Sequence, residues 1–238
     1  MIKIDYFIMK VFYNAAIGAI EILVFYLAVS CASMDELWST MKISVLTFQG
    51  FNEIDSLVAF RMLKWLDKKD WDIRICCPDN EVTSMGGLTI RSQSMLEDAT
   101  TADAVFVGSG KLTRNIVADA NLMSRIKLNP KHQIIAAQCS GTLMLAKLGL
   151  LNSVPACTDS LTKPWVQDAG IEVLNQPFYA KDKIATAGGC LASAYLTAWV
   201  IAMLDGVDTA SKALYYFAPM GEKDEFVERA FKNISPYL

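Results

Sequence analysis

One cysteine stands where its thiol could do chemistry. An apolar run at residues 133–137 ends in Gln138-Cys-Ser-Gly141, and a helical pattern follows at residues 142–148. A strand that turns directly into a helix holds one side chain exposed and strained, and it directs the first backbone N–H groups of the helix towards whatever that side chain attacks. A helix N-terminus also favours thiolate over thiol. The pattern therefore indicates a nucleophilic Cys139, with a buried structural cysteine as the alternative.

The composition narrows the class of protein further. With 238 residues, 53% of them hydrophobic, the chain is long enough for one α/β domain with a sizeable core and an additional segment. The net charge of −3 is nearly balanced, and no basic stripe with interleaved aromatic residues occurs. These features argue against nucleic acid as the main partner.

The cysteine and histidine content bears on metal binding and on the cellular compartment. Six cysteines form no CxxC pair and no zinc-type spacing, and the single histidine is His132. We therefore expect no metal site, no cofactor and a cytoplasmic location, where thiols stay reduced. The cysteines other than Cys139 and the N-terminal Cys31 are expected to serve packing; they are Cys76, Cys77, Cys157 and Cys190.

Residues 1–33 differ from the rest of the chain. Residues 15–30 are apolar over about the length of a signal-peptide core, although Glu21 would be costly at the centre of a bilayer. Three alternatives remain open for residues 1–40. The first is a signal or membrane anchor, which would mean export or membrane attachment. The second is a helix packed on the domain or on a partner subunit. The third is upstream sequence included by a misplaced start.

A single domain is expected at residues 41–238. Met34 and Met41 both precede a complete-looking pattern, so the second and third alternatives for the N-terminal segment rank above export. Strands are expected at residues 42–47, 71–77, 104–107, 133–137, 154–158, 171–173 and 184–187. Helices are expected at residues 54–68, 112–126, 142–148, 161–168, 192–204, 211–217 and 224–231, with a short hairpin at 82–92.

This alternation of strands and helices predicts an α/β fold with a parallel sheet covered on both faces. In such sheets a functional site lies beyond the carboxyl ends of the strands. Three loops that leave strand ends carry small or polar residues, at 49–55, 108–110 and 138–141. We expect these loops to converge at one place.

The motifs after Met41 resemble, in the same order, those of the ThiJ/PfpI superfamily. The resemblance implies a flavodoxin-like three-layer sandwich with a mostly parallel sheet and a nucleophile elbow, related to class I glutamine amidotransferases. It covers the chain to about Gly206. It rests on Phe48–Asp55, Gly86–Ile90, Asp103–Gly110, Ala137–Gly141, Gly149–Leu151, Ala156–Thr158 and Ala187–Gly189.

Within that superfamily the chain most resembles the isonitrile hydratase branch. The resemblance implies a cofactor-independent cysteine enzyme, a lyase that adds water to a small isonitrile to form an N-substituted formamide. Cys139 would be the catalytic cysteine and Asp55 the acid beside it. Backbone N–H groups of Ser140 and Gly110 would stabilise an oxyanion. The resemblance also implies a homodimer.

The chain departs from the superfamily in ways that affect chemistry. Asp159 stands where many members have a histidine that can pair with the cysteine, and His132 precedes the strand, too far away to replace it. Glyoxalase-type and protease-type activities are therefore in doubt. Gly108-Ser109 also stands where Pro-Gly is common.

Several site assignments keep an alternative. Asp55 could share a proton with Cys139, or it could be the N-cap of the helix at 54–68. Glu53 would be the acidic partner if the register is off by two residues. Thr158 and Asp159 could line the pocket or serve as turn residues.

Two other kinds of function compete with the enzyme hypothesis. The chain could be a redox- or ligand-sensing module whose Cys139 is oxidised without turnover. It could also be a partner-binding domain that has lost activity. The absent histidine keeps that last alternative open.

Overall fold

The computed structural model describes residues 40–238 of the chain. The chain divides into two units, Met1–Thr40 and Met41–Leu238. The three alternatives for residues 1–40 therefore concern a segment that, apart from Thr40, lies outside the described residues. Within residues 40–238, none of the helices combines the length and apolar composition needed to cross a membrane.

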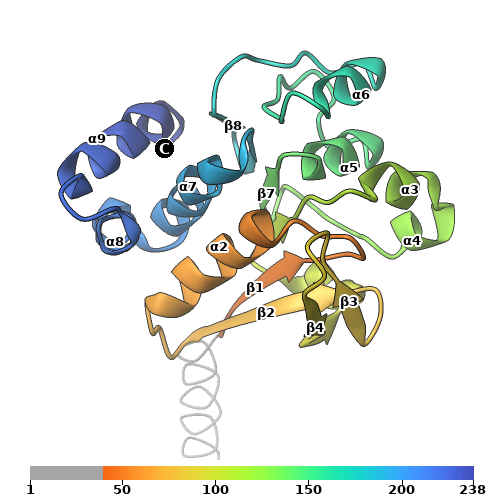
Figure 1. Ribbon diagram of the computed structural model, residues 1–238, viewed down its shortest axis with the longest axis horizontal. Helices are drawn as coiled ribbons and strands as arrows, with labels where there is room; N and C mark the ends of the chain where they lie inside the picture. The colour runs from red at the N-terminus through yellow and green to blue at the C-terminus, as the bar shows by residue number, and fades with distance from the viewer. Residues whose placement is uncertain (1–39) are drawn as a thin grey trace, which may run out of the picture. The chain divides into compact units, whose positions relative to one another are not determined.

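A seven-stranded sheet forms the centre of the second unit (Figure 1). Neighbouring strands are parallel except for the last pair, β9 and β8, which is antiparallel. The expected mostly parallel sheet is therefore confirmed. The order is β5 (Ser94–Met95), β2 (Trp71–Cys77), β1 (Met41–Leu46), β6 (Ala104–Val107), β7 (Ile134–Gln138), β9 (Ile184–Ala187) and β8 (Phe178–Lys181).

The expected hairpin forms a separate two-stranded sheet. Its strands are β3 (Glu81–Thr83) and β4 (Thr89–Arg91), which pair antiparallel. The loop between them contains Gly86 and Gly87, and Gly87 has a φ of +95°, a value that favours glycine.

The central strands end together because of their register. Val107 of β6 pairs with Ala137 of β7, and Gln138 of β7 pairs with Ala187 of β9. All residues of these three strands are buried, as expected for a parallel sheet covered on both faces. The loops that follow the three strands therefore start from the same edge of the sheet.

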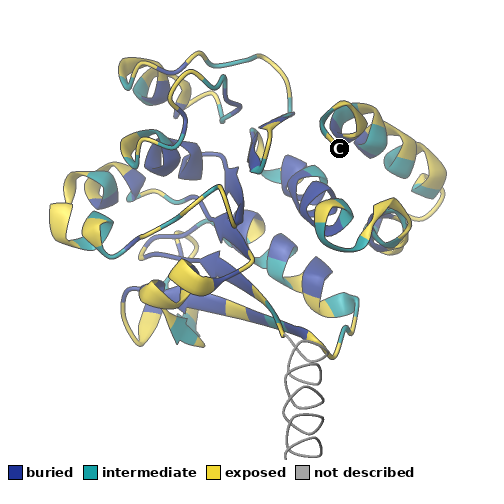
Figure 2. Ribbon diagram, turned by 180° about the vertical axis from the view of Figure 1, so that it is seen from behind, coloured by how far each residue is buried: buried dark blue, intermediate teal, exposed yellow. Residues whose placement is uncertain are grey.

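Helices cover both faces of the sheet, each over its own hydrophobic core (Figures 1 and 2). One core includes α2 (Glu53–Trp65), α7 (Ser193–Asp205), α8 (Val207–Phe217) and α9 (Lys223–Ile234). The other includes α3 (Thr113–Ala118), α5 (Gly141–Lys147) and α6 (Lys163–Asp168), with α4 (Ala120–Ser124) beside α3. Short 3₁₀ turns are η1 (Leu96–Thr101), η2 (Cys190–Ala192) and η3 (Ser235–Tyr237).

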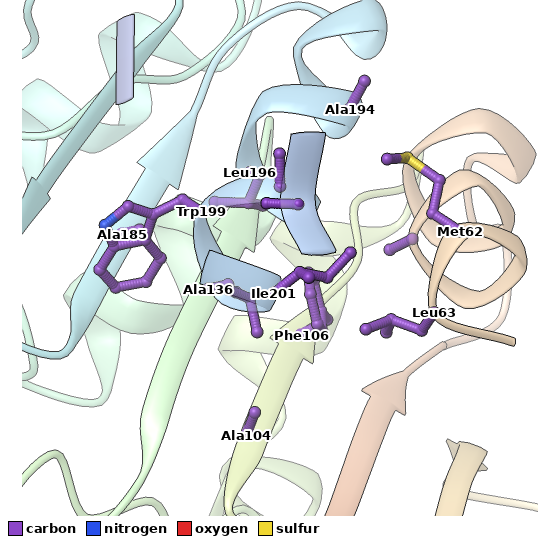
Figure 3. Packing of buried hydrophobic residues seen from close by; sticks show 14 of the residues in the cluster. Met62, Leu63, Ala104, Phe106, Ala136, Ala185, Ala194, Leu196, Trp199 and Ile201 are labelled. Carbon is purple, nitrogen blue, oxygen red and sulfur yellow. The ribbon is translucent and has the colours of Figure 1, made fainter. Parts of the chain in front are cut away.

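Successive residues of a strand point to opposite faces of the sheet, so each strand contributes alternate residues to the two cores. Phe106 belongs to the core under α2 and α7, whereas its neighbour Val105 belongs to the core under α5. Figure 3 shows Phe106 among side chains of α2 and α7, including Leu63 and Ile201. The largest fully buried side chain, Trp199 of α7, belongs to the same core.

Two helices occupy the region in which one helix was expected, at residues 112–126. Helix α3 ends at Ala118, and Asp119 then takes an extended conformation. Its carboxylate accepts hydrogen bonds from the backbone N–H groups of Asn121 and Leu122, each at 3.0 Å. Asp119 is thus the N-cap of a new helix, α4, and this cap divides the expected helix.

The sequence prediction was also wrong at four strand positions. The expected strands at 154–158 and 171–173 reduce to one isolated bridge between Ala156 and Val173. The two edge strands, β5 and the antiparallel β8, were not expected. Strand β5 has two residues and β8 has four, of which two are buried, and such short strands give no clear apolar pattern.

Candidate functional site

Cys139 lies at a sharp turn between a strand and a helix. Strand β7 ends at Gln138, α5 begins at Gly141, and Cys139 between them has a φ of +46°. Such a conformation costs a non-glycine residue about 1–3 kcal/mol, and it recurs at functional sites. A Cβ on Gly141 would lie 2.4 Å from the carbonyl oxygen of Val107, so only glycine allows the helix to start this close to β6. The expected elbow is confirmed.

The thiol at this elbow is buried, whereas the sequence pattern predicted an exposed side chain. Cys139 is only 4% exposed, and its backbone N–H donates to the carbonyl of Ala187 at 2.8 Å. The Nε2 of Gln138 donates to the Cys139 sulfur at 3.4 Å and to the carbonyl of Gly189 at 2.9 Å. The thiol is therefore enclosed by the ends of β7 and β9.

The three loops meet as predicted. Phe51 and Gly110 form an antiparallel bridge between the first two loops. The hydroxyl of Ser109 donates a hydrogen bond to the carboxylate of Asp55. The second loop also reaches the third, because the N–H of Gly110 donates to Ser140 Oγ at 3.1 Å.

Asp55 is buried beside the elbow and is not the helix cap. The N-cap of α2 is Asn52, whose side chain accepts from the N–H of Ile54 at 3.1 Å. The N-cap alternative for Asp55 is therefore wrong. Burial raises the pKa of the Asp55 carboxyl, and interactions with Ser109 and with the nearby thiols offset only part of that effect.

The Cys139 thiol is also stabilised in its neutral form. Burial raises its pKa, and the charge of Asp55 raises the pKa further, whereas the Gln138 side chain lowers it slightly. Burial and the adjacent carboxylate therefore oppose the thiolate that the helix N-terminus was expected to favour. His132 is exposed and precedes β7, at the opposite end of the strand, so it offers Cys139 no base.

Cys190 is a third member of the site that the sequence analysis did not identify. One carboxylate oxygen of Asp55 and the sulfurs of Cys139 and Cys190 all lie within 4.8 Å of one another. Asn52 Nδ2 donates to the Cys190 sulfur at 3.2 Å. Cys190 directly follows the glycine pair after β9, so the carboxyl-end rule for parallel sheets was the available signal.

Glu53 lies against the hairpin instead of the elbow. Its Oε1 accepts from Ser84 Oγ at 2.5 Å and from the N–H of Gly86 at 3.0 Å. The hydrogen bond from Ser84 is the main cause that lowers the pKa of the Glu53 carboxyl. The structure thus places Asp55, and not Glu53, beside Cys139.

Thr158 and Asp159 have different positions. The hydroxyl of Thr158 donates to the carbonyl of Cys139 at 2.8 Å and thereby stabilises the backbone of the elbow. Asp159 accepts from the N–H groups of Leu161 and Thr162, at 2.9 and 3.0 Å, which makes it a turn residue. Asp159 therefore does not replace the histidine of related proteins, although its charge contributes to the raised pKa of Asp55.

The two expected oxyanion donors, the N–H groups of Gly110 and Ser140, differ in whether they are already hydrogen-bonded. The N–H of Gly110 is engaged by Ser140 Oγ, which in turn lies 2.7 Å from Thr113 Oγ1. Gly110 is thus not a free donor in this conformation. Within residues 40–238, the backbone N–H of Ser140 has no hydrogen-bond acceptor, so it remains available to a ligand.

Comparisons with known proteins agree with this geometry. The family model described as "DJ-1/PfpI family" matches residues 41–203. A search of curated proteins found no significant match. The family match covers the sheet, the elbow and all three members of the Asp55, Cys139 and Cys190 cluster.

Solved structures with a similar fold come from several organisms. DJ-1 of Schizosaccharomyces pombe is 14% identical with a TM-score of 0.64, over 75% of this chain and 99% of that one. A THiJ/PfpI family protein from Pseudomonas syringae is 19% identical with a TM-score of 0.67, over 83% and 89%. Oxidized DJ-1 of Toxoplasma gondii is 16% identical with a TM-score of 0.62, over 74% and 97%. At these identities the likeness establishes the fold alone.

Proposed function

The chain belongs to the DJ-1/PfpI family, and on that premise we propose that it is a cofactor-independent cysteine enzyme that hydrates isonitriles to N-substituted formamides. One observation carries the proposal. The strained Cys139 presents its thiol to the buried carboxyl of Asp55, with no imidazole nearby. Such a pair is suited to adding a proton and a sulfur to the same carbon atom.

The first step is addition of the thiol across the terminal carbon. Burial raises the pKa of both Asp55 and Cys139, and two negative charges this close are unfavourable, so the pair reacts from a state in which it shares one proton. That proton moves to the terminal carbon of the isonitrile while the Cys139 sulfur bonds to the same carbon. The product is a thioimidate, R–N=CH–S–Cys139, and all atoms of both reactants are kept.

The second step releases the product. The Asp55 carboxylate takes a proton from water, and the hydroxide adds to the thioimidate carbon. Asp55 passes that proton to the nitrogen. As the carbon–sulfur bond breaks, the proton of the added hydroxyl returns to the Asp55–Cys139 pair, and R–NH–CHO leaves. The N–H of Ser140, which has no acceptor within residues 40–238, would stabilise charge that develops during this addition.

Exposed apolar residues that adjoin residues of this region in sequence favour a substrate with an apolar substituent. Ile54 directly precedes Asp55 in sequence, and Leu191 directly follows Cys190. Leu161 begins the turn that Asp159 caps. Their exposed fractions are 44%, 82% and 79%, respectively, which is high for large apolar side chains. We infer that an alkyl or aryl group of the isonitrile would bind against these residues.

The test is turnover of a simple isonitrile by the reduced protein. Incubation with cyclohexyl isonitrile should yield the formamide, measured by mass spectrometry, and Cys139→Ala should lower the rate by at least about 10³-fold. Cys157→Ala is the matched control, because Cys157 is fully buried outside the cluster. Formamide production that persists in Cys139→Ala would overturn the nucleophile assignment.

Cys190 supports a second candidate function, peroxide sensing. A hydroperoxide would oxidise the Cys139 thiol to a sulfenic acid and be reduced to an alcohol. The Cys190 thiol would then attack that sulfur, forming a disulfide and releasing water. The nearby sulfurs support this route, and oxidised DJ-1 of Toxoplasma gondii is among the similar structures. Peptide mapping after peroxide treatment should find a Cys139–Cys190 crosslink; oxidation of Cys139 without it would contradict the route.

A further inference from the structure

The cluster of Asp55, Cys139 and Cys190 has the donors of a metal site. Two sulfurs and one carboxylate oxygen lie within 4.8 Å of one another. In tetrahedral zinc sites, Zn–S distances of about 2.3 Å and Zn–O distances of about 2.0–2.2 Å place neighbouring donors roughly 3.5–3.8 Å apart. The distances between the donors therefore need to shorten by at most about 1.3 Å to match such a site.

Each donor of the cluster is held by an outer hydrogen bond. Asn52 Nδ2 donates to the Cys190 sulfur at 3.2 Å, and Gln138 Nε2 donates to the Cys139 sulfur at 3.4 Å. Ser109 donates to one oxygen of Asp55. Metal ligands in proteins are oriented by such outer partners, which also stabilise thiolate and carboxylate charge.

The carboxyl of Asp55 has an unused buried oxygen. Its Oδ1 has no hydrogen-bond partner within residues 40–238, and the residue is only 4% exposed. None of the ion pairs in that part of the chain includes Asp55. Burial without a cationic partner disfavours the ionised carboxyl, and a bound cation would supply that partner.

From these observations we propose that Asp55, Cys139 and Cys190 bind a thiophilic divalent cation of the Zn²⁺ type. Two thiolates select zinc over magnesium or calcium, and three protein ligands leave a fourth position for water. Cys190 is the half-buried member of the three. The histidine count suggested no metal site, but this donor set needs no histidine.

Metal binding would occupy the same sulfur that the proposed hydration uses. A bound ion would therefore suppress turnover reversibly, and removal of the ion would restore it. The metal proposal rests on donor geometry and does not depend on the hydration proposal. Zn²⁺ binding can thus be measured without an isonitrile, and its outcome does not depend on whether the protein hydrates isonitriles.

The experiment is a Zn²⁺ titration of the full chain, reduced with a phosphine and competed by a chromophoric chelator. All proteins carry Cys31→Ser, so that the thiol outside the described residues does not contribute. One equivalent should bind, and Cys190→Ser should weaken binding at least about 100-fold. Co²⁺ bound in place of Zn²⁺ should show thiolate-to-cobalt charge-transfer absorption.

Two further variants separate the metal site from a general thiol effect. Asn52→Ala removes the outer donor to Cys190 and should weaken Zn²⁺ binding about tenfold, and it retains all three ligands. Cys157→Ala should bind as the parent does. Absence of one-equivalent binding by the parent, or equal affinity in Cys190→Ser and the parent, would overturn the proposal.

Discussion

Two carboxyl groups at the start of α2 lie in contrasting surroundings. Asp55 is buried beside Cys139, and burial raises its pKa. Glu53, two residues earlier, accepts hydrogen bonds from the β3–β4 hairpin at Ser84 and Gly86, which lower its pKa. The same helix turn therefore places one acid beside the elbow and another against the hairpin.

Helix geometry explains the difference. Side chains two positions apart on a helix are separated by about 200° of rotation around the helix axis. The two acids therefore cannot enter one pocket. Asn52 caps the helix and also contacts Cys190, which fixes the rotation of α2 relative to the elbow. The contrast teaches that proximity in sequence does not make two acids interchangeable, and it can be tested by matched substitutions.

The largest expected effect is on turnover. Asp55→Asn retains an acceptor for Ser109 but loses the titrating group, so kcat/KM for isonitrile hydration should fall at least about 100-fold. Glu53→Gln makes the same chemical change on the hairpin side and should leave kcat/KM close to that of the parent. Steady-state kinetics of the two variants measure the contrast. Equal losses in both would mean that the two carboxyls do not differ in role.

A smaller effect is expected on stability when a glycine is replaced with alanine, either at the elbow or in the hairpin that contacts Glu53. In Gly141→Ala the new Cβ would meet the Val107 carbonyl, fixed backbone, at 2.4 Å. In Gly86→Ala it would meet Glu53 Oε1 at 2.3 Å, the end of a flexible side chain.

Gly141→Ala should therefore lower the free energy of unfolding by about 1–3 kcal/mol, and Gly86→Ala by less. Urea denaturation of both variants would measure the two values. If Gly86→Ala proved as damaging as Gly141→Ala, the hairpin contact would be as rigid as the elbow.

The last contrast concerns pH, through the Cys77 thiol, which shares a small buried cluster with Val82 of the hairpin. Burial raises the pKa of Cys77 from 9.0 to about 11. The unfolded chain therefore releases this proton first as the pH rises, so the stabilisation is complete below pH 9 and is lost towards pH 11. Urea unfolding between pH 8 and 10.5 should show falling stability, with a shallower fall in Cys77→Ala. An identical slope in both proteins would contradict this origin.

Much of the site could be predicted from the chain. The strand pattern and the small residues after three strand ends implied that the loops of Asp55, Gly110 and Cys139 converge, and they do. This worked because parallel strands with short connections place their carboxyl ends at one edge. The family resemblance followed from the same ordered motifs, and the family model supports it.

Other parts of the site could not be predicted. Cys190 looked like a packing residue because its own sequence carries no motif; only the carboxyl-end rule, applied to the strand at 184–187, pointed to it, and that rule does not say which residue after the strand reaches Cys139. The choice between Asp55 and Glu53 depends on how α2 is rotated. The division of residues 112–126 into two helices depends on the cap at Asp119, which competes locally with a continuous apolar pattern.

The sequence by itself determined the parallel sheet, the elbow at Cys139 and the set of loops around it, because periodicity and strand-end residues are local properties. Tertiary structure alone decided that the Cys139 thiol is buried with a raised pKa, that Asp55 is its neighbour and that Cys190 joins them. Desolvation and contact between distant strands depend on how the layers pack. No local pattern records that packing.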